Sequence, residues 1–422
     1  MNVVVQGLWH LGSVTAACLA AAGHRVIGLD ADASTIAKLR EGKAPISEPG
    51  LDELLAKHAA NLEITTDVTA AARADVAWVA YDTPVDADDR ADVEFVVGEV
   101  GKMLPHLRDG AVVIVSSQLP VGSVARLEAM RPGVRFAASP ENLRLGKAIS
   151  VFSDPDRVIV GVRDEQTKTV ITELLAPITS KIEWMSVESA EMTKHAINAF
   201  LALSVTFANE VASVCERVGA DAKQVERGLK TESRIGPKAY LAPGGAFAGG
   251  TLARDVAFLT TIGAQFELAL PLLSGVRPSN EAHKKWALRR LQDRLGGLKG
   301  HTVAVWGLTY KPGTDTLRRS AAVELCRDLS DAGAKVVAWD PAVLALPAEL
   351  SSMITLAPSA TAAIAEASAL VVATEWPELK NIEPGALSRM KRRLVVDANR
   401  FLAKNLGTTD IEYYAVGVPS HG

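Results

Sequence analysis

Short apolar runs alternate with longer stretches of helical periodicity through the first third of the chain. Each run is about as long as a buried strand and is rich in β-branched residues, whereas the stretches between them repeat their apolar positions with a helical period. This alternation predicts a doubly wound, mostly parallel sheet with helices on both faces. The predicted strands are Val3–Val5, Arg25–Leu29, Val76–Ala80, Val112–Val115, Arg135–Ala138 and Arg157–Val160.

A long helical run follows between Ser186 and Gly219, with no proline or glycine before its end. A helix of this length is long for a globular protein and suits a spine that connects two lobes. Further helical pattern comes after it, interrupted at 241–251 by the segment LAPGGAFAGGT, which is too rich in glycine to lie inside a helix or strand.

A second α/β alternation begins near His301. Its first strand ends in a loop, because the Pro and Gly of YKPGTD at 310–315 interrupt regular structure. The predicted strands are Val303–Trp306, Lys335–Trp339, Ala369–Ala373 and Arg393–Asp397. The chain is therefore predicted to be an α/β protein with two Rossmann-like doubly wound domains, at 1–185 and 298–422, joined by a long central helix and a helical domain at 186–297.

The composition excludes several classes of protein. The 422 residues are 48% hydrophobic, so each predicted domain can bury its own core. A formal net charge of −4 gives no global basic field, and we expect neither nucleic acid nor a membrane as partner. The apolar N-terminal stretch lacks a basic segment and is interrupted by glycines, so we expect no signal peptide and no membrane span there.

The cysteines and histidines argue against disulfides and metal sites. Three scattered cysteines, Cys18, Cys215 and Cys326, form no Cys-x-x-Cys pair and fit a reducing compartment, so we expect a cytoplasmic protein. They lie in apolar helical stretches, which predicts that they are buried small hydrophobes. The eight histidines show no ligand spacing, and we predict no metal site.

The first predicted βαβ unit has the context of a dinucleotide site. Strand Val3–Gln6 leads into the loop GLWHLG at 7–12, and a helix over Ser13–Ala22 and a second strand follow. Asp30 stands at the end of that second strand. A carboxylate in this place can accept hydrogen bonds from both ribose hydroxyls of adenosine, and it disfavours a 2′-phosphate. We therefore expect NAD rather than NADP as the cofactor.

Trp9 breaks the usual glycine pattern of this loop. In a Gly-x-Gly-x-x-Gly pattern that starts at Gly7, the indole takes the position of the second glycine, which normally lets the backbone approach a diphosphate. Three interpretations are open. In the first, Trp9 turns outward and the cofactor binds over a displaced loop; in the second, protein atoms partly fill the site. An α/β domain that binds no dinucleotide is the third.

Eight further blocks are distributed in order over nearly the whole chain. They are APISEPGLDELL (44–55), TPVDADDRADVEFV (83–96), QLPVGS (118–123), SPENLRLGKA (139–148), AEMTKHAINAF (190–200), RIGPKAYLAPGGAFAGG (234–250), WGLTYKPGTDTLR (306–318) and ATEWPELKN (373–381). Together with the N-terminal βαβ unit, these blocks resemble the UDP-glucose/GDP-mannose dehydrogenase family.

The resemblance implies an architecture and a reaction. The architecture is an NAD-binding domain, a long central helix within a helical dimerisation domain, and a C-terminal nucleotide-sugar domain, so we expect a homodimer. The reaction is the oxidation of the primary alcohol of a nucleotide-linked hexose to a carboxylate with two NAD, through a cysteine thiohemiacetal and thioester. A UDP-sugar is the expected substrate, and polysaccharide biosynthesis the expected setting.

Four catalytic residues are implied by the same resemblance. Lys194 and Asn198 match a lysine and an asparagine near the reacting hydroxyl, and four residues apart they share one face of a helix. Asp255 matches an acidic residue that partners this lysine and a water, and Glu141 matches the acidic residue of a Pro-Glu motif. Such groups could stabilise an alkoxide, hold a water or accept a proton.

The reactive cysteine of the family is missing. Its position falls on Thr251, and no cysteine lies between Glu216 and Leu325, so no shift of register supplies one. A threonine hydroxyl is far less acidic than a thiol and needs an adjacent base to attack a carbonyl. Leu145 and Gln118 also depart from the family, where a second acidic residue and a threonine are expected. We therefore predict an atypical member for which the thioester route is closed.

The remaining contacts implied by the resemblance fall into two sets. Those with the cofactor are Gly7, Trp9, Leu11, Gly12, Asp30, Thr83, Pro84 and Gln118. Those with the substrate, in part across the dimer, are Leu143, Arg234, Tyr240, Gly245, Lys311 and Arg318. Backbone amides of a glycine-rich loop and paired cations suit a diphosphate, although such a loop can also serve as a flexible hinge.

Three functions follow from these observations. The first is an NAD-dependent oxidoreductase that performs a single two-electron oxidation, or an altered family reaction, on a nucleotide sugar. The second is a redox-neutral enzyme, such as an epimerase, that acts on the same class of substrate. The third is a non-catalytic nucleotide-sugar binder whose cofactor site is blocked by Trp9.

Overall fold

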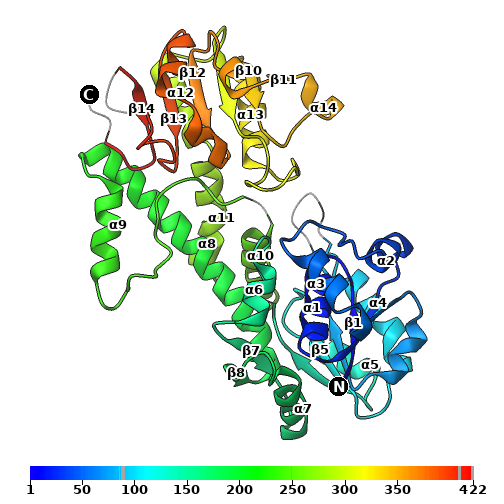
Figure 1. Cartoon of the computed structure of the whole chain (residues 1–422). Helices are drawn as coiled ribbons and strands as arrows, with labels where there is room; N and C mark the ends of the chain where they lie inside the picture. The colour runs from blue at the N-terminus through cyan, green and yellow to red at the C-terminus, as the bar shows by residue number, and fades with distance from the viewer. Residues whose placement is uncertain (85, 87–90, 142, 249, 407–409, 420–422) are drawn as a thin grey trace. The chain divides into compact units, whose positions relative to one another are not determined.

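The computed structural model describes residues 1–84, 86, 91–141, 143–248, 250–406 and 410–419 (Figure 1). The chain divides into two units, Met1–Ile197 and Asn198–Gly422. Each unit contains one sheet flanked by helices, and each is described below by itself.

The first unit is built on a sheet whose strands, within the described residues, lie in the order β3-β2-β1-β4-β5-β6-β7-β8. β1 is central and pairs in parallel with β2 and β4, whereas β6 and β7 pair antiparallel. The strands are β1 Asn2–Gln6, β2 Arg25–Leu29, β3 Leu62–Thr65, β4 Val76–Val79, β5 Val112–Val115, β6 Arg135–Ala138, β7 Val158–Gly161 and β8 Ile182–Met185. This is the doubly wound, mostly parallel sheet predicted from the sequence.

Helices cover both faces of this sheet because successive strand residues point to opposite sides. Val3 and Val5 of β1 pack with one set of helices, which includes α1, α3, α6 and α7, while Val4 packs with α4 and α5 on the other face. The helices are α1 His10–Ala21, α2 Ala33–Arg40, α3 Leu51–Lys57, α4 Val93–Met103, α5 Ser123–Met130, α6 Ala148–Ser153 and α7 Glu165–Leu175.

The predicted long helix is α8, Val187–Val218, and the division between the units falls inside it. Among the described residues, α8 is the one helix that length and composition alone would let cross a lipid bilayer, a test that buried core helices also pass. Its polar side chains are bonded to neighbouring elements: His195 Nε2 lies 3.0 Å from the Leu119 carbonyl oxygen, and Glu216 accepts a bond from the Trp286 indole at 2.9 Å. We therefore attach no membrane role to α8.

The second unit has a parallel sheet in the order β11-β10-β9-β12-β13-β14, counted over the described residues. Its strands are β9 Thr302–Trp306, β10 Lys335–Trp339, β11 Ile354–Leu356, β12 Ala369–Val372, β13 Leu394–Asp397 and β14 Glu412–Tyr414. Val303 and Val305 of β9 pack on one face, and Ala304 and Trp306 pack on the other. The second Rossmann-like sheet is therefore confirmed.

The helices of the second unit form a helical segment and the cover of the sheet. They are α9 Ala222–Thr231, α10 Thr251–Gln265, α11 Pro271–Lys284, α12 Trp286–Leu295, α13 Ala321–Asp331, α14 Ala348–Ser351 and α15 Ala360–Ala363. A small core of Ala199, Ala202, Val256 and Val276 joins α8, α10 and α11. The domain boundaries predicted from the sequence stay a prediction.

Four strands were not predicted from the sequence. β3, β8, β11 and β14 lie at the edges of the two sheets, and most of their residues are only partly buried. A strand at a sheet edge buries fewer apolar residues, so its hydrophobic run is too weak to stand out in the sequence.

Candidate active site

The loop between β1 and α1 has the geometry of a dinucleotide site at its first and third glycines. Gly7 adopts φ +90°, and a Cβ there would lie 2.7 Å from the Tyr81 ring. A Cβ on Gly12 would lie only 1.6 Å from the Gly7 carbonyl oxygen, so the start of α1 can pack on β1 only with glycine at this position. These are the tight turn and the close helix–strand packing that the fingerprint requires.

Asp30 is positioned for the ribose of a dinucleotide. Its Oδ2 accepts a hydrogen bond from the Leu8 N–H at 2.6 Å, and its Oδ1 accepts one from the Asp32 N–H at 2.9 Å. The residue is partly exposed, so each carboxylate oxygen keeps lone pairs that can face a ligand. Gly7, Gly12 and Asp30 therefore fit the adenosine end of NAD.

The Trp9 side chain points outward, since 49% of the residue is exposed. Its φ of −77° lies in a region open to any residue, and its backbone starts α1 without a side-chain cap. Protein atoms nevertheless reach the start of α1: Asp82 Oδ2 accepts a bond from the Leu11 N–H at 3.3 Å. Sequence reasoning missed Asp82, although an acidic residue just past the carboxyl end of a strand was a visible signal.

The other predicted cofactor contacts lie on neighbouring loops of the first unit. The Thr83 hydroxyl donates to the Gln118 carbonyl oxygen at 2.8 Å, and Pro84 is exposed. Gln118 lines a small cavity of about 20 Å³ together with Glu191, Lys194 and other residues. This volume suffices for one water molecule.

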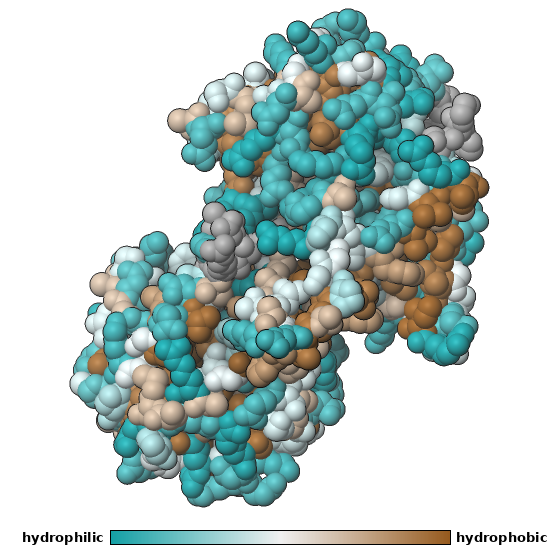
Figure 2. Space-filling view, turned by 180° about the vertical axis from the view of Figure 1, so that it is seen from behind, coloured by the Kyte–Doolittle hydropathy of each residue, from teal (hydrophilic) through white to brown (hydrophobic). Residues whose placement is uncertain are grey.

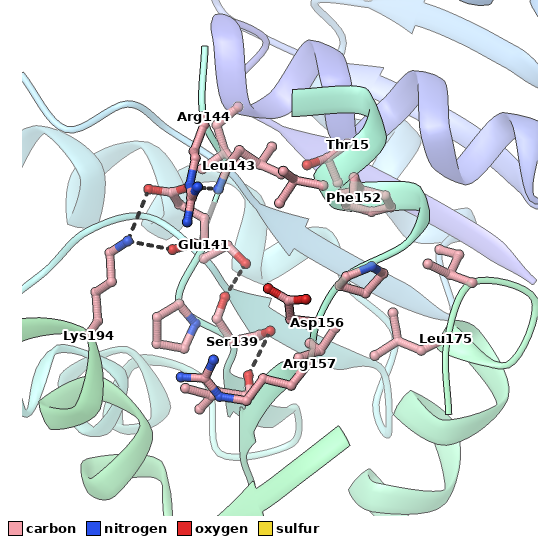
Figure 3. A pocket seen from close by; sticks show the side chains of 18 of the residues that line it. Thr15, Ser139, Glu141, Leu143, Arg144, Phe152, Asp156, Arg157, Leu175 and Lys194 are labelled. Carbon is pink, nitrogen blue, oxygen red and sulfur yellow. Dashed lines mark hydrogen bonds and ion pairs between the residues drawn. The ribbon is translucent and has the colours of Figure 1, made fainter. Parts of the chain in front are cut away.

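Lys194 and Glu141 are brought together, as Figure 3 shows. The Lys194 ammonium donates to the Glu141 main-chain carbonyl oxygen at 2.7 Å and lies 3.6 Å from its Oε1. The two side chains are only 13% and 22% exposed. The other carboxylate oxygen of Glu141 accepts a bond from the Leu143 N–H at 2.6 Å, so the loop after β6 holds the carboxylate in place.

A cavity of about 420 Å³ opens beside this pair in the first unit (Figure 3). Lys194, Glu141 and Leu143 line it, and apolar side chains that include Phe152 and Leu175 line it as well. Its lining comes from several segments, among them α1, the loop after β6, α6 and α8. Charged groups beside an apolar wall suit a substrate with both polar and apolar faces.

Glu48 connects the cofactor loop to the loop that carries Glu141, and sequence reasoning missed it. Its side chain is 1% exposed, and it lies 2.9 Å from His10 Nε2. It also accepts bonds from the Gly146 and Ala148 N–H groups at 2.7 and 2.9 Å. Burial acts to raise the pKa of Glu48, but these bonds and His10 outweigh it and hold the pKa below its ordinary value.

The second unit brings Asn198 and Asp255 together. The Asn198 amide donates a short hydrogen bond to Asp255 Oδ2, and the Asp255 side chain is fully buried. Thr251 is the exposed first residue of α10, four residues before Asp255, so the two share one face of that helix. The position implied for the reactive cysteine is therefore a helix N-terminus, next to a buried carboxylate.

The glycine-rich loop before α10 is anchored by hydrogen bonds at several of its described residues. The Gly244 N–H donates to Asn209 Oδ1 at 3.0 Å, and the Gly245 N–H donates to Asn399 Oδ1 at 2.7 Å. Asn280 exchanges two bonds with the backbone of Phe247, at 3.0 and 2.8 Å. Sequence reasoning missed these asparagines because they lie far from the loop along the chain.

A second cavity of about 420 Å³ lies in the second unit, beside this loop. It is lined by Gly245 and Lys311, whose contact with substrate stays a prediction, and by Lys284 and Lys285. Arg234, Tyr240 and Arg318 are exposed and do not line it in the described part of the chain: Arg234 pairs with Glu232 at 2.9 Å, and the Tyr240 residue is 59% exposed. Their contact with substrate stays a prediction.

The three cysteines are buried inside the fold. Burial raises the pKa of Cys18 to about 11 and that of Cys326 to about 12, and Cys215 is 5% exposed. A thiol with a raised pKa is a poor nucleophile. Within the described residues, no group of three or more His, Cys, Asp or Glu side chains is arranged to hold a metal ion.

Comparisons with family models cover most of the chain. Residues 1–179 match the NAD binding domain of the UDP-glucose/GDP-mannose dehydrogenase family, 188–282 match its central domain, and 304–404 match its UDP binding domain. The first of these matches confirms the prediction of NAD as the cofactor.

Individual relatives align over the full chain. The chain is 34% identical to a UDP-glucose 6-dehydrogenase of Rhizobium meliloti, over 99% of this chain and 100% of that protein. It is 32% identical to a UDP-glucose 6-dehydrogenase of Haloferax volcanii, over 96% and 98%. The structure of a UDP-glucose dehydrogenase from Pyrobaculum islandicum is 30% identical and superposes with a TM-score of 0.88, over 99% of this chain and 98% of that one.

Proposed function

Because the chain belongs to the UDP-glucose/GDP-mannose dehydrogenase family, we propose that it oxidises the primary alcohol of a UDP-sugar to an aldehyde, with NAD, in a single two-electron step. One observation carries the restriction to a single step: Thr251 stands at the first position of α10, where the resemblance implies the reactive cysteine. The chain's three cysteines are buried elsewhere, so no thiol is available to form a thioester.

The acid–base chemistry rests on two pairs of side chains. Bound NAD would accept the hydride that leaves the alcohol carbon. The Lys194 ammonium and the Asn198 amide would stabilise the alkoxide as the hydroxyl proton leaves, and Asp255 would accept that proton directly or through a water. Glu141 holds the Lys194 ammonium in position through its carbonyl and carboxylate oxygens. Alcohol and NAD⁺ then give aldehyde, NADH and a proton.

The nucleotide of the substrate is proposed to bind in the cavity of the second unit. Support comes from the match of this region to a UDP binding domain and from the loop that presents Gly245 beside Lys311. Lys284 is paired with Glu281 and Glu324 at 3.0 Å each, and Lys285 with Asp328, so these cations are already held in place before a diphosphate arrives.

We also propose that two copies of the chain pair through α8. Phe200, Phe207 and Val214 follow one another at intervals of seven residues, Val218 continues the row, and each of the four is between 46% and 70% exposed. Figure 2 shows hydrophobic side chains gathered in a band over this part of the second unit. A seven-residue repeat places them along one face of a helix, which can pack on the same face of a second copy.

Location in the cytoplasm stays a prediction.

The decisive assay counts NADH per sugar with the purified protein and a panel of UDP-, GDP- and TDP-sugars. We expect one NADH per molecule of UDP-sugar and an aldehyde product, detected by NMR. Two NADH and a carboxylate would exclude the single-step reaction. Sugar turnover without net NADH would favour the redox-neutral alternative, and binding without turnover the non-catalytic binder.

Thr251→Cys tests whether the missing thiol limits the reaction. A thiol at the first position of α10 would have its pKa lowered by the helix N-terminus and would be able to attack the aldehyde. We expect carboxylate and a second NADH from this variant, whereas the matched Thr251→Ser variant should still release aldehyde. No carboxylate from Thr251→Cys would assign the loss to Gln118 and Leu145 as well.

A further inference from the structure

The N-terminus of α1 has no cap from its own segment. α2, α4 and α7 each begin after an aspartate, Asp32, Asp92 and Asp164, whose carboxylate accepts backbone N–H bonds. α1 begins after Trp9, which makes no side-chain cap, and its first turn contains no acidic residue. The N–H groups that start α1 therefore keep the partial positive charge of a helix N-terminus and have no local partner.

Asp82 provides the missing partner from a different part of the sheet. It follows β4, and its Oδ2 accepts a hydrogen bond from the Leu11 N–H across 71 residues of sequence. The His10 N–H also acts on this carboxylate. Residues 10 and 11 are the first two of α1, so one carboxylate serves the amides of both.

The residues on either side of Asp82 are fixed, which sets the direction of its side chain. Tyr81 is 8% exposed, packs on Gly7 and meets the Phe95 ring edge-on at 5.7 Å. Thr83 is 7% exposed and is bonded to the Gln118 carbonyl. Asp82 itself keeps solvent exposure, so its carboxylate can leave α1 by rotating its side chain while the backbone stays in place.

The diphosphate of a dinucleotide bound to a Rossmann sheet takes its hydrogen bonds from these same N–H groups at the start of the first helix. We propose that the Asp82 carboxylate occupies the diphosphate position of the NAD site, and that NAD binds only by displacing it. The inference rests on the proposed use of NAD. It deepens that function by naming the residue that sets the affinity for the cofactor.

The charge of Asp82 opposes the binding of a diphosphate. Protein atoms around the carboxylate raise the pKa of Asp82, and the like charge of Glu141 raises it further, whereas the Leu11 N–H and His10 act in the opposite direction. Of the facing groups, His10 lies against Glu48, and Glu141 lies against Lys194. An arriving diphosphate adds a further like charge beside Asp82, so the charged carboxylate has to leave the start of α1 before NAD can bind there.

Asp82→Asn tests the proposal by calorimetry with three ligands. The amide keeps the size of the side chain but loses the charge that excludes a diphosphate. We expect the Kd for NAD and for ADP-ribose to fall about tenfold. Binding of adenosine, which has no phosphate but contacts Asp30 in the same way, should not change.

Asp109→Asn is the matched control, because it removes the same charge from an exposed residue that precedes β5, at the opposite end of the strands. It should leave the Kd for NAD unchanged. Three results would overturn the role of Asp82 but leave the proposed use of NAD intact. They are an unchanged Kd for NAD in Asp82→Asn, a higher Kd for NAD, or a Kd for adenosine that falls as much as that for NAD. Absence of NAD binding by both proteins would overturn the proposed function as well. If Asp82→Asn does not fold, Asp82→Ser takes its place, and equal NAD binding by Asp82→Ser and wild type overturns the proposal.

Discussion

The two sheets begin with the same local design, in the sequences VVVQGL and VAVWGL. In both, a glycine with a positive φ leaves the first strand, +90° at Gly7 and +88° at Gly307. Its N–H donates to the carbonyl that ends the second strand, Leu29 at 2.9 Å in one unit and Trp339 at 2.7 Å in the other. A serine hydroxyl then bonds back to the carbonyl that follows each glycine, at 2.7 and 2.6 Å. The backbone framework is the same in both units.

The acid at the end of the second strand is used differently in the two units. Asp340 is 3% exposed, and its Oδ2 accepts bonds from the Leu308 N–H, from the N–H and hydroxyl of Thr309, and from the Trp376 indole at distances from 2.7 to 3.0 Å. Asp30 accepts only backbone bonds and stays partly exposed. The carboxylate of Asp340 is occupied by hydrogen bonds inside the fold, whereas that of Asp30 can bind a ribose.

The connections from β1 and β9 to the helices that follow them differ as well. In the first unit, α1 starts three residues after Gly7 and points its N-terminus at the carboxyl end of the sheet. In the second unit, a long loop separates Gly307 from α13, whose N-terminus is capped by its own Ser320. The same framework thus leaves the acid partly exposed and the helix without a cap from its own segment in the first unit, whereas the acid is buried and the helix is capped in the second.

The largest expected effect comes from Gly12→Ala. Gly12 lies at the short connection from β1 to α1 and has no counterpart in the long loop from β9 to α13. The new Cβ would overlap the Gly7 carbonyl oxygen, so α1 must move, and we expect a loss of more than about 3 kcal/mol in the free energy of unfolding. Gly313→Ala in the long loop meets no atom within 4 Å but has φ +80°, and it should cost about 1 kcal/mol. Urea unfolding measures both, and equal costs would contradict the packing argument.

Asp340→Ala should follow, with a loss of about 3 kcal/mol. It leaves the Leu308 and Thr309 N–H groups without their acceptor, and the buried Trp376 indole keeps only the Thr309 hydroxyl at 3.2 Å. The thermal midpoint and the urea midpoint should both fall, while the Kd for NAD should not change. If the affinity for NAD fell together with the stability, Asp340 would have a role in cofactor binding besides its structural one.

Asp30→Ala should show the reverse behaviour. We expect a stability loss of only about 1 kcal/mol, because Asp30 is partly exposed and water can take the place of its carboxylate. The Kd for NAD should rise about tenfold or more, since the ribose loses its acceptor. Calorimetry with NAD checks this, and unchanged affinity would remove Asp30 from the cofactor site.

The smallest effect is expected at Asp32, which caps α2 just after Asp30. The second unit offers no equivalent, because no helix directly follows Asp340 there. Bonds from the Thr35 hydroxyl and from Ser34 lower the pKa of Asp32 from 3.8 to about 2. Because the folded pKa is depressed, its stabilisation is complete above about pH 4 and is lost as the pH falls towards 2. Asp32→Asn should therefore differ from wild type in thermal midpoint at pH 6, and the difference should shrink in acid. A constant difference would show that the charge of Asp32 plays no part.

The sequence determined the central strands, both sheets and α8 because each depends on local periodicity. β2, β5, β6 and β10 have the predicted bounds, since continuous β-branched runs mark buried strands. It also determined Asp30, Lys194 and Asp255 as candidates, because each stands at a fixed place in a strand–turn–helix pattern or a recognisable block. The absence of a cysteine at Thr251 needs no structure at all.

Only the tertiary structure decided which of these groups have partners. Asp82 meets the start of α1, Glu48 joins His10 to the loop after β6, and Asn399 fixes the glycine-rich loop, each across a long separation in sequence. Asp30 and Asp340 end equivalent strands, yet one is partly exposed and the other is buried under Trp376. Burial and hydrogen bonding between distant segments are properties of the packed chain, and no local pattern records them.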